Sequence, residues 1–233
     1  MLDEAFEALK KFDWGTDLVV VAPIDDAVAT THGQADARRE LEHRLVAALG
    51  GKLSRDAQDY VCRKLTIVGT AAAVPALASR LGAPHHSHMA RFALERMPAP
   101  EAAKALRDAL PKVNGELKIG VLSSIGARRD TAAIAAVSEL LGDSNPKIAT
   151  AAAHALGAIG GTESAQALAA ARSSNDSQPA VIDALLACAE SLLAEHSEAE
   201  AMKIYSSLAG DHQGRLVRLA ATRGMLACAS KQG

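Results

Sequence analysis

The chain has 233 residues, of which 49% are hydrophobic, 22% are charged and only 3% are aromatic. This composition excludes a disordered chain and disfavours an all-β sandwich or barrel, which would need more aromatic and β-branched residues. The 25 basic and 27 acidic residues give a formal charge of −2, without the basic excess of a dedicated nucleic-acid binder. No apolar run approaches the about 20 residues of a membrane helix, so we expect no membrane insertion.

The first 50 residues are predicted to form an atypical N-terminal helical cap, with helices at about 2–12, 23–31 and 35–49. Phe6, Phe12 and Trp14 supply bulk there that the alanine-rich remainder lacks. The opening residues are acidic and amphipathic, so we do not expect them to act as a signal peptide. The compartment stays open: we expect a cytoplasmic location by default, or an exported one if the chain is part of a larger precursor.

Residues 51–195 carry two series of apolar positions that recur about every 30 residues. The first series ends one helical pattern in each unit: Leu65, Leu94, Ile125 and Leu156. The second series lies twelve positions later, at the centre of the next helical pattern: Leu77, Leu106, Val137 and Leu168. Since the two series advance together, they predict a repeating two-helix unit, which is typical of an α-solenoid.

Turn and capping signals divide the chain into short helices that cannot be stable alone. The expected helix pairs are 35–49 with 54–68, 71–81 with 86–97, 100–110 with 115–126, 131–141 with 146–159, 163–172 with 179–195, and 198–209 with 213–230. Asn145 before Pro146 is a helix start, and Ser197 with Glu200 fits a capping box. Residues 196–233 are expected to close the solenoid as a final helix pair. Alanine is predicted to let neighbouring helices approach closely.

The segment DSNPKIATAAAHALGAIGGTESAQAL, residues 143–168, resembles the repeat of HEAT-like proteins of the phycobilin-lyase type. The resemblance extends over about 54–172 and implies an all-α, HEAT-like solenoid (superhelix) of about five to six antiparallel helix pairs. Residues 87–111 and 125–130 are also similar to HEAT regions of large multidomain bacterial proteins. That likeness implies a piece of such a protein or a stand-alone relative of it.

Three polar motifs have two interpretations each. Residues 85–88, with three histidines, suit a Zn²⁺ or Ni²⁺ site, but a polar turn is favoured because no further ligands follow at the required spacing. Asp25 and Asp26 could act in acid–base chemistry, although the first turn of a helix accounts for them better. Residues 128–130 could contact a phosphate or carboxylate, although a turn is favoured, in which Asp130 caps the following helix and the arginines are solvated or bridge repeats.

The sequence has no nucleophile elbow, Walker loop, dinucleotide fingerprint or zincin motif. We therefore predict no catalytic residue, no metal site and no cofactor. Three widely spaced cysteines lie within helical patterns and are expected to be buried thiols rather than a disulfide framework: Cys62, Cys188 and Cys228.

In a solenoid, the second helix of each pair is expected to line the concave side, so its outward residues should form a recurring stripe. The predicted partner-binding stripe is Asp59, Arg63, His88, Arg91, Glu95, Lys118, Lys147, Thr150 and His154. Its mixed charge suits a protein or peptide partner, and it has too few aromatics to stack nucleic-acid bases. Arg91 is the favoured central residue, because arginine is enriched among binding hot spots. A solvated face without a ligand is the alternative.

The function predicted from these features is a non-catalytic scaffold or binding module. Two alternatives remain open. The resemblance to phycobilin-lyase-type repeats implies a bilin-lyase-like enzyme or enzyme subunit, although no residue demands such a ligand. The resemblance to multidomain bacterial proteins implies a structural domain that spaces or docks the parts of a larger protein.

Overall fold

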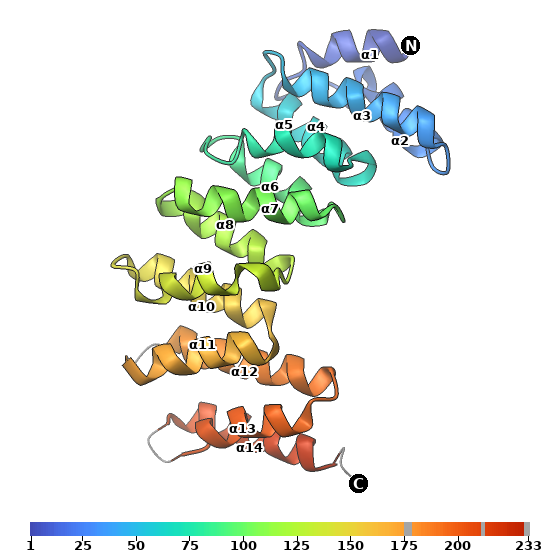
Figure 1. Cartoon of the computed structure of the whole chain (residues 1–233). Coiled ribbons are helices and arrows are strands. Elements are labelled where there is room, and N and C mark those ends of the chain that lie inside the picture. Colours follow the sequence, from blue (N-terminus) through green and yellow to red (C-terminus); the bar gives the residue numbers. More distant parts are fainter. Residues whose placement is uncertain (175–178, 211–212, 231–233) are drawn as a thin grey trace. The chain divides into compact units, whose positions relative to one another are not determined.

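The computed structural model describes residues 1–174, 179–210 and 213–230, and every regular element in these ranges is a helix (Figure 1). The chain divides into two compact units, Met1–Ser124 and Ile125–Gly233. Within each unit the helices pair and stack as in an α-solenoid. The predicted all-α fold class is thereby confirmed.

The first unit begins with three helices and continues in helix pairs. Its elements are α1 (Leu2–Leu9), the 3₁₀ turn η1 (Leu18–Val20), α2 (Ala22–Thr30), α3 (Ala35–Leu49), α4 (Arg55–Val68), η2 (Ala71–Ala73), α5 (Val74–Ala78), α6 (Ser87–Arg96), α7 (Pro100–Ala109), η3 (Leu110–Lys112) and the part of α8 (Gly115–Ala127) up to Ser124.

The second unit continues the same alternation. Its elements after α8 are η4 (Thr131–Ala133), α9 (Ile134–Glu139), η5 (Leu140–Gly142), α10 (Pro146–Ile159), α11 (Gly161–Ser174), α12 (Pro179–Ala194), α13 (Glu198–Leu208) and α14 (Arg215–Ser230). The predicted helix pairs therefore match the observed ones closely. The division into a cap at 1–50, repeats at 51–195 and a closing pair at 196–233 stays a prediction.

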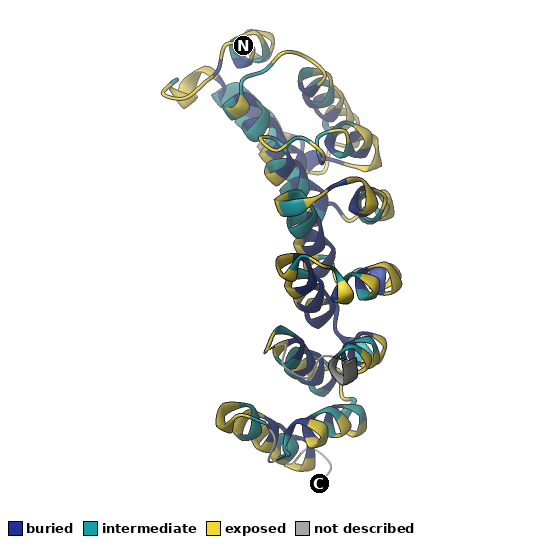
Figure 2. Ribbon diagram, turned by 90° about the vertical axis from the view of Figure 1, so that its left-hand side faces the viewer, coloured by how far each residue is buried: buried dark blue, intermediate teal, exposed yellow. Residues whose placement is uncertain are grey.

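The helices of each unit form two layers. The second helices of successive pairs pack on one another, α4 on α6 in the first unit and α10 on α12 in the second. The first helices form the other layer, with α5 on α7 and α9 on α11. Within each unit, buried residues lie on the helix sides that face other helices, and exposed residues lie outside (Figure 2). The second-helix layer is where the predicted stripe belongs.

The two apolar series form the centre of the core. All eight side chains are 0% exposed: Leu65, Leu94, Ile125, Leu156, Leu77, Leu106, Val137 and Leu168. Small residues allow α10 and α12 to approach closely. A Cβ added at Gly157 on α10 would lie only 2.9 Å from the Cα of Ala184 on α12. No single helix pair could bury these faces by itself, so stability comes from stacking.

The structure confirms one of the three predicted side-chain caps, at Asn145, and contradicts those at Asp130 and Ser197, where the side chain makes no capping hydrogen bond. The Asn145 side chain accepts a hydrogen bond from the Lys147 amide at 3.0 Å, as an N-cap should. The capping box predicted at Ser197 was wrong, since its side chain makes no capping hydrogen bond. Instead the Ser197 amide donates to Leu192 O at 2.8 Å, and His196 adopts a φ of 60°. The turn that ends α12 therefore fixes the conformation of Ser197.

The first helix is also shorter than predicted, since α1 ends at Leu9. Beyond it, Lys11 and Phe12 still donate backbone hydrogen bonds, but to residues three positions earlier. The chain thus tightens into a 3₁₀-like turn, which places the buried Phe12 against Tyr60 of α4, with ring centroids 5.8 Å apart.

The three cysteines are buried and are not joined by disulfides, which confirms the prediction of buried thiols. Burial raises the pKa of the Cys62 thiol to about 12, and Asp59 adds to this effect while Arg80 opposes it. Burial also raises the pKa of Cys188 to about 12. Neither thiol is therefore ionised at neutral pH in the folded chain.

We expect the folded protein to resist thiol labelling. With a pKa of about 12, only about 10⁻⁴ of such a thiol is ionised near pH 8, against about a quarter for a free cysteine. Labelling with a chromogenic disulfide reagent should be slow in buffer and fast in guanidinium chloride, which serves as the unfolded control. Rapid labelling of the native chain would contradict the buried environment of these cysteines.

Candidate protein-binding surface

The first unit places five residues of the predicted stripe on two neighbouring helices. Asp59 and Arg63 lie one turn apart on α4, and His88, Arg91 and Glu95 lie on α6, which packs against α4. Arg63 and His88 are exposed, whereas the other three are half-buried. The sequence therefore predicted a common layer for these residues, but not which of them reach solvent.

Asp59 is a half-buried carboxylate beside two arginines of its own helix. Its Oδ2 lies 4.0 Å from Arg55 Nε, one turn earlier. Burial raises the pKa of Asp59, while the positive charges of Arg55 and Arg63 act in the opposite direction. Arg63 makes no side-chain hydrogen bond or ion pair with any described residue, which leaves its guanidinium facing solvent next to a weakly solvated carboxylate.

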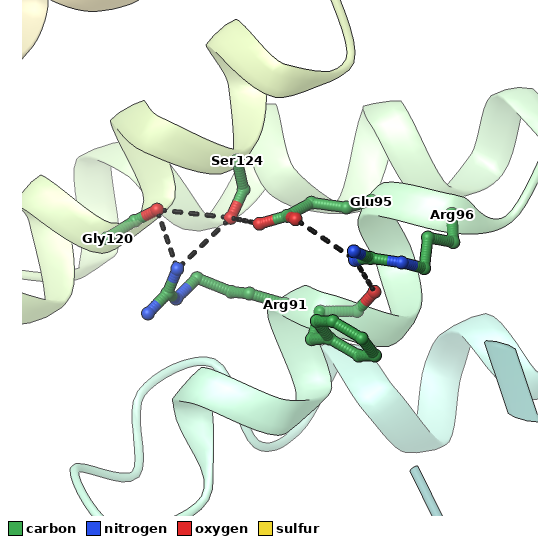
Figure 3. Close-up of polar contacts among 6 residues, drawn as sticks. Arg91, Glu95, Arg96, Gly120 and Ser124 are labelled. Carbon is green, nitrogen blue, oxygen red and sulfur yellow. Dashed lines mark hydrogen bonds and ion pairs between the residues drawn. The ribbon is translucent and has the colours of Figure 1, made fainter. Parts of the chain in front are cut away.

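A polar cluster joins α6 to α8 at the centre of the predicted stripe (Figure 3). Arg91 Nη1 donates to Gly120 O at 2.9 Å and to Ser124 Oγ at 3.2 Å. The Ser124 hydroxyl also lies 2.6 Å from Glu95 Oε1 and 3.1 Å from Gly120 O. The guanidinium of Arg91 is thus engaged within the chain.

The same cluster depends on a glycine. A Cβ at Gly120 would lie 2.6 Å from the guanidinium carbon of Arg91, so any larger residue there would displace the guanidinium from its present position. Burial lowers the pKa of Arg91, and the charge of Glu95 opposes that shift. Ser124 is fully buried, so its hydroxyl cannot meet a substrate from solvent. The cluster ties α6 to α8.

Glu95 also links the cluster to the surface. Its Oε2 lies 3.5 Å from Arg96 Nη1, and the Arg96 guanidinium stacks 3.6 Å above the ring of Phe92. The remaining stripe residue of this unit, Lys118 on α8, is half-buried.

The second unit carries the other three stripe residues on one helix. Lys147, Thr150 and His154 follow one another at three and four positions along α10, and all three are exposed. This spacing places them on one helix face. They form an exposed polar stripe on α10 of the second unit.

The other polar motifs have structural partners. Asp25 Oδ1 accepts a hydrogen bond from the Tyr60 hydroxyl at 3.0 Å and pairs with Lys64, so it joins α2 to α4. His85 and His88 are exposed and His86 is half-buried. Among the residues that the structure describes, no group of three or more histidine, cysteine or acidic side chains is placed to hold a metal ion.

Arginine contacts between helices recur in the structure, whereas the sequence indicated a bridging role only as one interpretation of residues 128–130. Arg38 Nε donates to Val68 O at 3.1 Å, and Arg129 Nε donates to Ile159 O at 3.3 Å, so each reaches a helix end 30 positions ahead. Arg91 donates to a carbonyl 29 positions ahead, Gly120 O, which lies inside α8 and not at a helix end. Arg129 Nη2 additionally lies 2.7 Å from Ser191 Oγ of α12 and 2.7 Å from Glu195 Oε1, which directly follows that helix. The only feature of the sequence that could have indicated such a contact is an arginine that precedes a helix end by about one repeat length, as Arg38 and Arg129 do.

The structure also contains cavities that the sequence did not indicate. The cavity between α1 and α3 has a volume of about 510 Å³ and is lined by Phe6, Lys10, Arg44, Ala47, Ala48, Gly51, Lys52 and Leu53. A second cavity of about 330 Å³ lies among α11, α12 and α13.

Among the described residues, no helix has the length and apolar character needed to cross a membrane.

Comparison with known proteins identifies the repeat. Residues 103–189 match the family model of HEAT repeats, which confirms the resemblance seen in the sequence. None of the curated proteins matches the chain. Among solved structures, it is similar to a crystal structure of an engineered protein with 20% identity and a TM-score of 0.42, over 97% of this chain and 68% of that one. Another engineered protein is similar with 18% identity and a TM-score of 0.42, over 89% and 97% of the two chains.

Proposed function

We propose that the protein is a non-catalytic HEAT-repeat scaffold that binds a protein or peptide partner through its second-helix layer. The observation that carries the proposal is the exposed pair of Arg63 and His88 on adjacent helices of the first unit. Arg63 is a surface guanidinium without a hydrogen-bonding partner among the described residues, and arginine is enriched among binding hot spots. The bilin-lyase-like alternative and the larger-protein alternative stay predictions.

The contacts of Arg91 change its place in this proposal. Its guanidinium already donates to Gly120 O and Ser124 Oγ, so binding a partner would require breaking those hydrogen bonds. Arg91 therefore supports the surface by holding α6 against α8, and Arg63 takes the contacting position. The mixed charge of Asp59, Arg63 and Glu95 suits a partner that carries both charge signs.

The test compares two charge reversals in the intact chain. Arg63→Glu changes the second-helix layer, whereas Lys112→Glu makes the same change of charge at an exposed residue of η3. Affinity purification with mass spectrometry from the native organism should lose specific partners with Arg63→Glu and keep them with Lys112→Glu. Identical partner sets for wild type and both variants would remove the support for this surface.

A further inference from the structure

Large exposed apolar side chains gather in two short segments of the chain. Apart from Met1 and Ile67, those that the structure describes lie either at residues 14–20 or on α14. Trp14 is 91% exposed and Leu216 is 80% exposed. The others are Leu18, Val19, Val20, Leu219 and Leu226. Apolar residues concentrated in this way mark interaction sites, whereas isolated ones need no explanation.

The first segment, residues 13–20, is called here the tryptophan loop. Its conformation is fixed by its own hydrogen bonds: Asp13 Oδ1 accepts from the Trp14 amide at 2.9 Å, and Asp17 Oδ1 accepts from the Val19 amide at 3.0 Å. Thr16 Oγ1 accepts from the Asp13 amide at 3.1 Å. The loop therefore presents an exposed indole between two carboxylates, followed by branched aliphatic side chains, and residues 13–20 include no basic residue.

The second segment is the outer face of α14. Leu216, Leu219 and Leu226 lie on the side opposite the buried Ala221 and Cys228, since helix positions three, four and seven apart share a face. Arg223 lies among these leucines and is exposed. In α14 there are three arginines and no acidic residue. This face is therefore apolar and positively charged.

Charge decides which surfaces fit together. Two α14 faces placed against each other would bring arginines together, and two tryptophan loops would bring carboxylates together. A tryptophan loop against α14 pairs apolar with apolar surface and acidic with basic residues, which is the complementarity that specific interfaces show. It also allows Trp14 to act as an anchor and Arg223 to meet either its ring or a carboxylate.

We propose that the tryptophan loop of one copy of this chain docks on the outer face of α14 of a second copy. The contact joins two different surfaces, so it is a head-to-tail contact between copies. It uses neither Arg63 nor His88 and is therefore independent of the proposed partner-binding surface. A loop of this size buries a small area, so the association is expected to be weak and dependent on concentration.

Trp14 provides a direct readout, because it is the only tryptophan of the chain. Its emission should shift to shorter wavelength as the concentration of the full chain rises from about 1 µM to about 200 µM, a range that covers weak dissociation constants. The sedimentation coefficient should rise over the same range. Leu219→Asp with Leu226→Asp should abolish both changes, whereas Ile67→Asp, at an exposed residue of α4, should leave them intact.

Mixing two variants tests the head-to-tail arrangement itself. Trp14→Ala keeps the α14 face, and the Leu219→Asp, Leu226→Asp variant keeps the tryptophan loop. Each should remain monomeric alone, and their mixture should form a dimer and no larger species. Circular dichroism confirms that each variant is folded, which is expected because all three side chains are exposed.

Three results would overturn the proposal. The first is a wild-type chain that stays monomeric over the whole concentration range. The second is a blue-shifted Trp14 emission that does not change with concentration. The third is a Trp14→Ala variant that still associates with itself, since this would show α14 meeting α14.

Discussion

Replacing Leu65 with alanine is expected to lower the free energy of unfolding by about 2–5 kcal/mol. Leu65 is 0% exposed and belongs to the series that forms the core of the second-helix layer. The substitution removes buried methyl groups and leaves a cavity that its neighbours on α4 and α6 can fill only in part. Urea denaturation followed by circular dichroism measures the change.

Ile67 provides the matched control, because it lies on the same helix two residues further on and is 56% exposed. Ile67→Ala removes a similar volume from a side chain that remains largely in contact with water. The free energy of unfolding should therefore change by no more than about 0.5 kcal/mol. Repeat proteins can unfold in more than one step, so the two variants are compared by the transition of the first unit. Equal effects of the two substitutions would contradict the layered core.

Valine at Gly157 is expected to destabilise the second unit by about 1–3 kcal/mol or more. A Cβ there would lie 2.9 Å from the Cα and 3.0 Å from the Cβ of Ala184, which is closer than real Cβ contacts. The obstacle includes backbone, so α10 and α12 must separate to accept the side chain. Thermal and urea denaturation should both report the loss.

His154→Val is the control for this substitution. It places the same β-branched residue on α10, one turn earlier and on the exposed face. Its effect should be limited to helix propensity, a few tenths of a kcal/mol. If Gly157→Val were as stable as His154→Val, the close approach of α10 and α12 would not exist in solution.

The helix pairs and the core could be predicted from the sequence because their causes are local or periodic. The repeat of about 30 residues placed Leu65, Leu94, Ile125 and Leu156 in equivalent positions, and each is fully buried. Asn145 before Pro146 marked the start of α10, since the side chain caps the helix that immediately follows. The same reasoning failed at Ser197, where the turn ending α12 fixes the backbone.

The sequence could not predict whether each stripe residue faces solvent or contacts a neighbouring helix, because this depends on contacts between helices that are distant in sequence. Helix periodicity placed Arg91 on the outward side of α6, but whether it meets a partner or a neighbouring helix depends on the absence of a side chain at Gly120. The exposure of Trp14 could not be predicted either. Bulky residues near the start suggested a cap, yet Phe12 is buried and Trp14 is 91% exposed.

The arginine contacts imply a rule for how such a chain lengthens or shortens. Arg38, Arg91 and Arg129 each bind a carbonyl 29 or 30 positions ahead, so each bond spans about one repeat length along the chain. Duplicating or deleting one whole repeat preserves that offset, whereas gaining or losing a few residues inside a repeat moves the carbonyl out of reach. The number of repeats in such a chain can therefore change, whereas the number of residues within each repeat is constrained.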